Sequence, residues 1–250
     1  MNNDSLYYLG VSFICLFFLL LVVEEDTHFP KSEIAEPFET LAKRNKQDKI
    51  DKQCIVYCVG DSMLNNARYV DANESVLANL TKDNNTNTTG TGTGTGTNTN
   101  FKFKMLAKDG ARITDAFSQM DTINGDINGI CHCIVLSAGG NDLLAEDGEP
   151  REIFQQFLDL VKSIHIKFGD AIPLIVLGLY YPPQKPRFHD RIKQWNVWLD
   201  EYKRSKEYKM NVIQTSDFIT DADDICYKIE PSAQGGQKIA HHIMMELTNV

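Results

Sequence analysis

The stretch YCVGDSM at residues 57–63 ends an apolar run with a glycine, an acid and a serine. The run before this turn, CIVYCV at residues 54–59, is rich in β-branched side chains and predicts a parallel strand covered on both faces. A serine at the exit of such a strand is where an α/β enzyme places a nucleophile. It is also where an ordinary strand-to-helix turn places a helix cap. The sequence therefore offers two roles for Ser62, attack on a substrate or capping of a helix.

The chain beyond this turn continues to alternate strands and helices. We expect further strands at 101–106, 133–138, 173–179 and 210–215, and helices at 63–80, 113–121, 150–168, 188–207 and 233–247. Five strands that alternate with five helices predict an α/β fold, with a parallel sheet covered by helices on both faces. Because reactive groups gather at the carboxyl ends of the strands in such sheets, the loops after the strands are the ones to compare.

Two segments fall outside this pattern. Residues 6–23, LYYLGVSFICLFFLLLVV, carry no charge and are just long enough to cross a hydrocarbon layer about 30 Å thick. A cleavable signal peptide needs a basic beginning, whereas this chain begins MNNDS, so we expect residues 1–23 to be an uncleaved membrane anchor. A charged stalk at 24–52 follows. The second segment, 82–100, has almost no apolar side chains and predicts a disordered insertion in a single domain at 53–250.

The charge and the cysteines exclude some classes of partner. The net charge of −9 argues against a nucleic-acid partner, because no basic face would neutralise phosphates. The six cysteines include no CxxC pair, and Cys54, Cys58, Cys131 and Cys133 fit small buried residues of two strands. A zinc site needs four convergent ligands, so we expect no metal and no cofactor.

Four glycosylation acceptors of the form Asn-x-Ser/Thr occur, at Asn73, Asn79, Asn84 and Asn87. They favour a lumenal or extracellular position for the domain, although the last two lie in a tract whose composition produces them by chance.

Three residues in the loops after the first three strands are suited to bind an oxyanion. Ser62 offers a backbone N–H in the first loop, and Gly110, which has no side chain, lets its N–H approach a ligand closely. Asn141 in GGND offers a side-chain amide. Two backbone donors and one amide beside a serine hydroxyl predict an oxyanion hole.

The motifs GDS at 60–62, DGA at 109–111, GGND at 139–142 and EPSAQGGQKIA at 230–240 together resemble the SGNH hydrolase family, also called GDSL esterases. The resemblance covers residues 54–245 and rests on the order of the motifs, each on the loop after its own strand. It implies a flavodoxin-like three-layer sandwich with a five-stranded parallel sheet in the order 2-1-3-4-5. It also implies hydrolysis of an acyl ester, often an acetyl group on a sugar or a lipid ester.

The same resemblance implies roles for individual residues. Ser62 would be the nucleophile, with the N–H groups of Ser62 and Gly110 and the side chain of Asn141 as oxyanion donors. Asp61 would support the turn.

The closing motif departs from the family pattern, in which Asp-x-x-His precedes the last helix. This sequence has YKIEPS at 227–232, so Tyr227 occupies the aspartate position and Glu230 the histidine position. A serine hydroxyl needs an adjacent base, and a carboxylate of pKa about 4.3 is a weaker base than an imidazole of pKa about 6.5. Burial raises the pKa of a carboxyl group, so Glu230 is a candidate base, with Tyr227 as its hydrogen-bond partner.

Four interpretations remain open. Ser62 and Glu230 form an unconventional dyad, or His189, in the loop after the fourth strand, supplies the base. Alternatively, hydrolysis is lost and the domain is an acyl- or carbohydrate-binding module, or it is a structural spacer on a surface protein. We favour a membrane-anchored serine esterase, whose substrate is a small acyl ester or an acylated carbohydrate or lipid.

Overall fold

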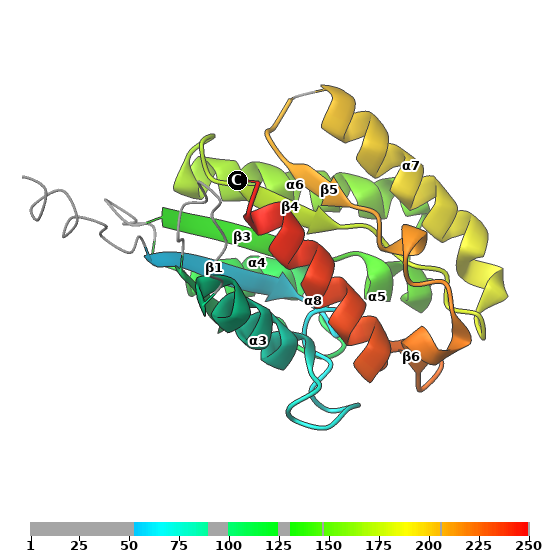
Figure 1. Ribbon diagram of the computed structural model, residues 1–250. Coiled ribbons are helices and arrows are strands. Elements are labelled where there is room, and N and C mark those ends of the chain that lie inside the picture. The colour runs from blue at the N-terminus through cyan, green and yellow to red at the C-terminus, as the bar shows by residue number, and fades with distance from the viewer. Residues whose placement is uncertain (1–52, 90–99, 125–130, 147, 206, 250) are drawn as a thin grey trace, which may run out of the picture. The chain divides into compact units, whose positions relative to one another are not determined.

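The computed structural model describes residues 53–89, 100–124, 131–146, 148–205 and 207–249. The centre is a five-stranded parallel sheet in the order β2-β1-β3-β4-β5 (Figure 1). The strands are β1 (Gln53–Gly60), β2 (Asn100–Met105), β3 (Cys131–Ser137), β4 (Leu174–Leu177) and β5 (Asn211–Ile213). The predicted α/β fold and the strand order are confirmed, and the predicted strand bounds differ from these by a few residues at most.

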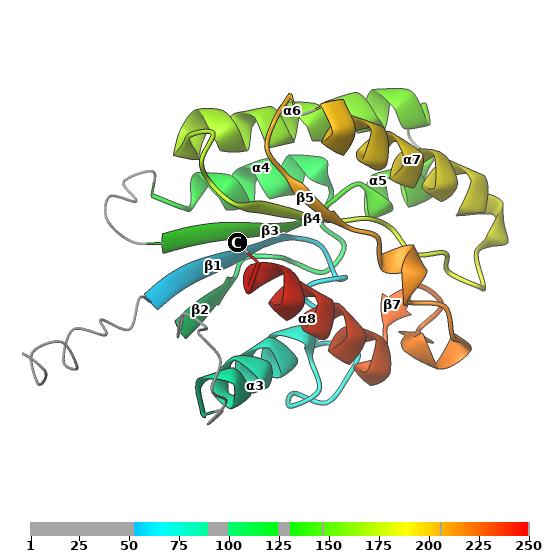
Figure 2. The same cartoon turned by 45° about the horizontal axis from the view of Figure 1, so that its top comes forward.

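Helices cover both faces of the sheet (Figure 2). One face carries α3 (Val76–Thr89) and α8 (Ala233–Leu247), and the other carries α4 (Ile113–Asp121), α5 (Gly140–Ala145), α6 (Pro150–Phe168) and α7 (His189–Ser205). The apolar residues of α6 recur at helical spacing, and its Phe157, Leu160, Val161 and Ile164 are fully buried. This periodicity is why the bounds predicted for α6 and α8 agree with the structure.

The residues between β1 and α3 correct one expectation. A helix was predicted at 63–80, but the chain forms turns through most of this stretch and α3 begins only at Val76. The side chain of Asn66 explains the difference, because its Oδ1 accepts the N–H of Val76 at 2.9 Å and its Nδ2 donates to the carbonyl of Pro231 at 3.2 Å. A buried polar side chain thus holds an irregular turn where the apolar pattern alone favours a helix.

The predicted insertion at 82–100 is also corrected at both ends. Residues 82–89 belong to α3, and Asn100 is the first residue of β2. The buried Asn84 bonds to both the N–H and the carbonyl of Phe101, at 3.1 and 3.0 Å, and so ties the helix to the strand. Residues 90–99 lie outside the described residues.

The cysteines of the sheet are of two kinds. Cys58 and Cys133 are free, and burial raises the pKa of each thiol to about 12, as expected of inert core residues. Cys54 is disulfide-bonded, which corrects its interpretation as a simple buried thiol. Within the part of the chain that the structure describes, no group of side chains forms a candidate metal site.

The membrane anchor at 1–23 and the stalk at 24–52 lie outside the described residues. None of the helices in the described part of the chain is long and apolar enough to span a bilayer.

Candidate active site

The turn after β1 places Ser62 at the carboxyl edge of the sheet. Gly60 has φ 127°, and a Cβ at this position would lie 1.7 Å from the carbonyl oxygen of Ser137 in β3. Only glycine fits this close approach. The following turn is closed by the carbonyl of Asp61, which accepts the N–H groups of Leu64 and Asn65 at 3.2 and 3.1 Å. Because α3 begins 14 residues after Ser62, at Val76, Ser62 caps no helix.

A buried glutamine clamps the end of β1. Gln119 of α4 accepts the N–H of Gly60 at 2.6 Å and donates to its carbonyl at 2.9 Å. Asn196 of α7 clamps Leu179, after β4, in the same way, at 2.9 and 2.6 Å. Two strand ends at the site are therefore fixed by side-chain amides as well as by the sheet.

Asp61 supports the turn from inside the protein. Its carboxyl group is 4% exposed, and it accepts the Ser137 hydroxyl at 2.6 Å and the Met63 N–H at 3.1 Å. The pKa of Asp61 is raised from 3.8 to about 7, chiefly by burial and also by the charge of Glu230, and the two hydrogen bonds oppose the shift.

This raised pKa predicts a dependence of stability on pH. Between pH about 4 and about 7 the folded chain holds a proton on Asp61 that the unfolded chain has lost, so the free energy of unfolding falls as the pH rises. The penalty is absent below pH about 4 and reaches up to about 4 kcal/mol above pH about 7. Asp61→Asn keeps an acceptor for Ser137 and removes the titration. Urea unfolding at several pH values is expected to show wild type losing stability relative to Asp61→Asn, and equal pH slopes would contradict this.

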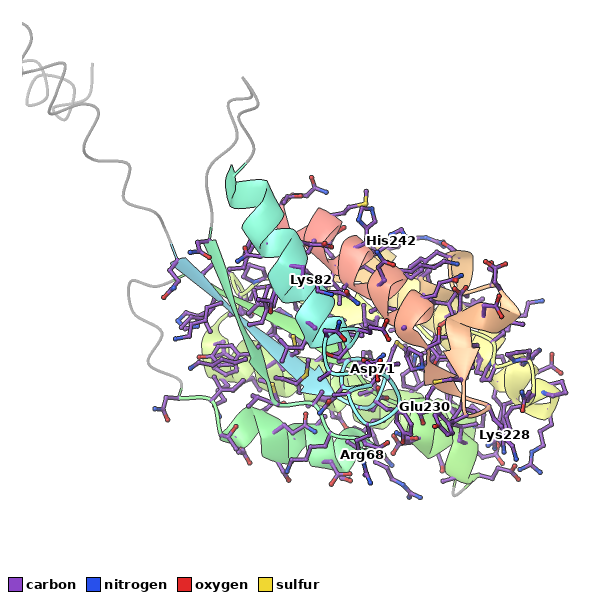
Figure 3. The ribbon with its side chains drawn as sticks, turned by 60° about the horizontal axis from the view of Figure 1, so that its bottom comes forward. Arg68, Asp71, Lys82, Lys228, Glu230 and His242 are labelled. Carbon is purple, nitrogen blue, oxygen red and sulfur yellow. The ribbon has the colours of Figure 1, made fainter. Side chains whose placement is uncertain are left out.

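Glu230 lies on a short hairpin that the sequence did not predict. Strands β6 (Ile225–Cys226) and β7 (Glu230–Pro231) pair antiparallel, and their connection includes Tyr227 and Lys228 at positive φ values of 45° and 78°. In Figure 3, Glu230 lies nearer the sheet and Lys228 lies at the outer end of the hairpin. The left-handed turn therefore leaves the Tyr227 side chain exposed to solvent, whereas Glu230 is buried.

The Glu230 carboxyl group is buried beside the Ser62 hydroxyl. It is 7% exposed, and its Oε2 has no hydrogen-bond partner among the described residues. Burial raises the pKa of Glu230 above its ordinary value, and a hydrogen bond from Ser62 opposes the shift. A carboxylate that is both desolvated and underbonded is a stronger base than one in water.

Two hydrogen bonds hold the backbone on either side of Glu230. The Tyr180 hydroxyl, after β4, donates to the carbonyl of Ile229 at 2.5 Å, and Asn66 donates to the carbonyl of Pro231. Tyr180 is buried, and this burial raises its pKa well above 10, so the phenol stays protonated and remains a donor. These contacts join three separate loops around the carboxyl group.

Tyr180→Phe removes this donor while keeping the ring. If Tyr180 positions Glu230, kcat for an acyl ester falls about tenfold with little change in KM, because small misplacements of reacting groups slow catalysis strongly. The hairpin also loosens and admits water, so the lower pH midpoint of activity moves down towards the ordinary carboxyl pKa. Steady-state kinetics across a pH series measures both effects. A loss of stability with an unchanged pH midpoint would indicate a purely structural role.

Ser62, Asn141 and Glu230 line one cavity of about 50 Å³. The amide of Asn141, in α5, donates to the carbonyl of Ala111 at 2.9 Å, which leaves its second N–H free for another acceptor. Gly110 lies in the adjacent turn at φ 71°, where it is exposed and does not line the cavity. The structure thus brings three of the four predicted catalytic residues together around one space, and Gly110 is not among the residues that line it.

Tyr227 and His189, which were predicted to support the site, are not among the residues that line the cavity. Tyr227 is 72% exposed and its ring packs against Tyr69 with centroids 5.5 Å apart, so the expected hydrogen bond to Glu230 is not formed. The Nε2 of His189 is 2.9 Å from the carbonyl oxygen of Pro182, and its ring meets Tyr181 edge to face. No histidine is among the described residues that line the cavity. Asp61 and Glu230 are the carboxyl groups in that lining, and Glu230 accepts a hydrogen bond from Ser62.

Comparison with solved structures identifies the fold. The chain matches a lipolytic protein of the G-D-S-L family from Veillonella parvula with a TM-score of 0.61 at 14% identity, over 79% of this chain and 100% of that chain. It matches the lipase/acylhydrolase from Enterococcus faecalis with a TM-score of 0.60 at 14% identity, over 78% and 95% of the two chains. The psychrotrophic esterase EstA from Pseudoalteromonas, inhibited in that structure by monoethylphosphonate, gives a TM-score of 0.56 at 13% identity, over 77% and 94%.

No protein-family model and no curated protein matches the sequence. The strand order, the helices on both faces and these structural matches agree with one another. The chain therefore has the fold of the SGNH hydrolases.

Proposed function

We propose that this chain is a serine esterase in which Ser62 is the nucleophile and Glu230 is the general base. The observation that carries the proposal is the buried Glu230 carboxyl group beside the Ser62 hydroxyl, in a cavity that both residues line. The structural neighbours include proteins described as esterases and lipases, which supports ester hydrolysis as the reaction class.

The proposed reaction proceeds in two steps. As the Ser62 Oγ bonds to the ester carbonyl carbon, its proton passes to the Glu230 carboxylate and the carbonyl π electrons move to the carbonyl oxygen. The resulting oxyanion accepts the second N–H of Asn141 and the backbone N–H of Ser62, which has no hydrogen-bond partner within the described residues. When the tetrahedral species collapses, the C–O bond breaks and the leaving alcohol takes the proton from Glu230.

The second step regenerates the serine. Glu230 removes a proton from water as the water oxygen attacks the acyl carbon, and the acid is released as Ser62 recovers its proton. The raised pKa of Glu230 strengthens the base that both steps need, at the expense of protonating it at mildly acidic pH.

The experiment that tests this proposal is hydrolysis of p-nitrophenyl acetate by the purified full-length chain. Release of p-nitrophenol that saturates with substrate is expected, with a burst if the acyl-enzyme accumulates. If wild type and Ser62→Ala release p-nitrophenol at the same rate, Ser62 is not a nucleophile for this reaction.

A binding module without hydrolysis is the second candidate function. It is favoured by one observation, the absence of histidine from the described cavity lining, since a carboxylate is intrinsically a weaker base than imidazole. A chain that binds acyl esters, hydrolyses none of them, and gains activity in Glu230→His would support this candidate.

We also propose that residues 6–23 anchor the chain in a membrane, with the domain in a lumenal or extracellular compartment. The proposal is supported by the uncharged sequence of that segment and by the disulfide bond of Cys54, since disulfides persist in oxidising compartments. The full-length chain is expected to stay in the membrane pellet during alkaline extraction, and a chain that lacks residues 1–23 is expected in the supernatant. Digestion of the domain by protease added to the cytosolic side would contradict the placement.

A further inference from the structure

We propose that Tyr69 is a positioning residue that holds the base Glu230 in register with the oxyanion donor Asn141. The inference rests on the proposed function, because it names what keeps these two halves of the site together. Tyr69 is not among the residues that line the cavity, so it acts through its neighbours. Its ring contacts the hairpin that carries Glu230, and its hydroxyl contacts the loop after β2.

The hairpin that carries Glu230 needs contacts from outside to keep its conformation. Its strands β6 and β7 have two residues each, and its turn includes Tyr227 and Lys228 at positive φ, a conformation that side chains disfavour. Tyr180 and Asn66 bond to the backbone on either side of Glu230, beyond this turn. The turn itself therefore depends on another contact.

Tyr69 supplies the contact with the turn. Its ring packs against the ring of Tyr227, with centroids 5.5 Å apart and ring planes at 48°. Because Tyr227 is 72% exposed, this ring pair lies outside the core. An aromatic pair favours its paired geometry about two- to tenfold. The contact therefore biases the turn towards the conformation in which Glu230 meets the Ser62 hydroxyl.

The hydroxyl of Tyr69 is fixed to the loop after β2. It donates to Asp109 Oδ1 at 2.7 Å, while Arg68 Nη1 lies 3.0 Å from the other carboxylate oxygen. Burial and the bond to Asp109 raise the pKa of Tyr69 to about 12, so the phenol stays protonated and remains a donor. The Tyr69 N–H donates to the carbonyl of Asn66 at 2.9 Å. The ring is therefore held at both its backbone and its hydroxyl.

The same loop orients the oxyanion donor. Two residues after Asp109, the carbonyl of Ala111 accepts one N–H of the Asn141 amide at 2.9 Å, which sets the direction of the other N–H. One short loop and one tyrosine thus connect Asn141 to the hairpin of Glu230. Displacement of Tyr69 is expected to move the base relative to the oxyanion donor, and a misplacement of about 1 Å can slow a reaction about 100-fold.

The first test is the hydrolysis of p-nitrophenyl acetate by variants of the full-length chain. Tyr69→Phe keeps the ring and breaks the bond to Asp109, whereas Tyr227→Ala removes the ring contact. Each is expected to lower kcat about five- to tenfold and to change KM less than about twofold, because neither side chain lines the cavity. The conservative Tyr227→Phe keeps the ring and should retain kcat within about twofold.

The double variant Tyr69→Phe/Tyr227→Ala tests whether the two contacts act in series. Breaking either contact releases the hairpin, so the double variant should have a kcat within about twofold of the slower single variant. Losses that multiply, to about 25- to 100-fold, would overturn the connection through Tyr69.

The control is Tyr202→Ala, near the end of α7. It removes a half-buried aromatic pair with Tyr208, whose centroids are 6.4 Å apart, and neither ring lines the cavity. We expect a lower unfolding midpoint with unchanged kcat, whereas Tyr227→Ala should lower kcat with little change in the midpoint. An equal loss of kcat in Tyr202→Ala would show that the effect is not specific to Tyr69.

The second test does not require hydrolysis. Hydrogen exchange followed by mass spectrometry is expected to be at least about threefold faster in peptides covering 225–231 in both Tyr69→Phe and Tyr227→Ala than in wild type. Peptides covering 107–111 should exchange faster only in Tyr69→Phe. These changes in a chain that hydrolyses no ester would leave the connection standing and refute the proposed function. Hydrolysis with a kcat unmoved by both variants, or unchanged exchange of the hairpin, would refute the role of Tyr69 and leave the esterase standing.

Discussion

Replacing Ser62 by alanine is expected to lower kcat/KM for p-nitrophenyl acetate by about 10⁴-fold or more, because the reaction loses its nucleophile. The variant should fold normally. The Ser62 backbone stays in the turn that Asp61 and Gly60 hold, and its hydroxyl contributes only a contact with Glu230. The loss should appear in kcat, with substrate binding retained, since the cavity walls are unchanged.

The matched control for this variant is Ser118→Ala on α4. Its hydroxyl is exposed and bonds only to the carbonyl of Thr114 in its own helix, at 3.4 Å. Full activity of Ser118→Ala, an unchanged unfolding midpoint for Ser62→Ala, and loss of hydrolysis only in the latter are the expected results. Residual hydrolysis within tenfold of wild type in Ser62→Ala would remove Ser62 from the mechanism.

Glu230→Gln is expected to lower kcat/KM by about 10³- to 10⁴-fold, near the upper end of the range typical for loss of a general base. The amide keeps the volume of the carboxyl group and a partner for the Ser62 hydroxyl, so the cavity keeps its shape. Removal of a buried, underbonded carboxylate should at the same time leave stability unchanged or raise it. A Glu230→Gln variant that is less active but at least as stable as wild type would identify Glu230 as a base and not as a structural residue.

The pH dependence of wild-type kcat/KM is a second test of Glu230 as the base. Glu230 acts as a base only when it is deprotonated, and burial raises its pKa, so kcat/KM should fall as the pH decreases through a midpoint above that of an ordinary glutamate. The residual activity of Glu230→Gln should lack this limb, and Glu201→Gln, at an exposed position of α7, should retain it. An acid limb that persists in Glu230→Gln would assign the titration to another group, with the buried Asp61 the first to examine.

The parts of the fold with a strong periodic signal were predictable from the sequence. β1 and β3 are continuous apolar runs because both faces of a central parallel strand are covered, and α6 carries its apolar residues at helical spacing. The positions of Ser62 and Asn141 followed from that order, because the carboxyl ends of neighbouring strands meet at one edge.

The contacts that shape the site left no local signal. Tyr180 bonds to the carbonyl of Ile229, 49 residues away, and Gln119 bonds to the backbone of Gly60, 59 residues away. The residues adjacent to Tyr180 and Gln119 in the sequence therefore do not indicate these contacts. Asn66 replaced the first turns of a predicted helix by bonding to Pro231, 165 residues away. Each is a buried amide or phenol that must find a partner in the core, and only the tertiary structure determines which partner that is.

Tyr227 is a residue for which the sequence predicted a contact that the structure does not form. Its spacing from Glu230 places it where the family has a partner for the base, which predicted a hydrogen bond. The positive φ values of Tyr227 and Lys228 turn the chain so that the Tyr227 side chain faces solvent. If the proposed mechanism holds, Glu230 works without the third group that orients a histidine. This is chemically reasonable, because a carboxylate has no tautomer to fix.

The rate at which a fluorophosphonate labels Ser62 tests most directly whether Glu230 activates this serine. Mass spectrometry of the full-length chain after timed exposure would locate the label and follow its growth in wild type and in Glu230→Gln. We expect a single label on the peptide that contains Ser62, formed at least about 100-fold faster in wild type than in Glu230→Gln at pH about 8. No label on Ser62, or equal labelling rates in the two chains, would contradict the account.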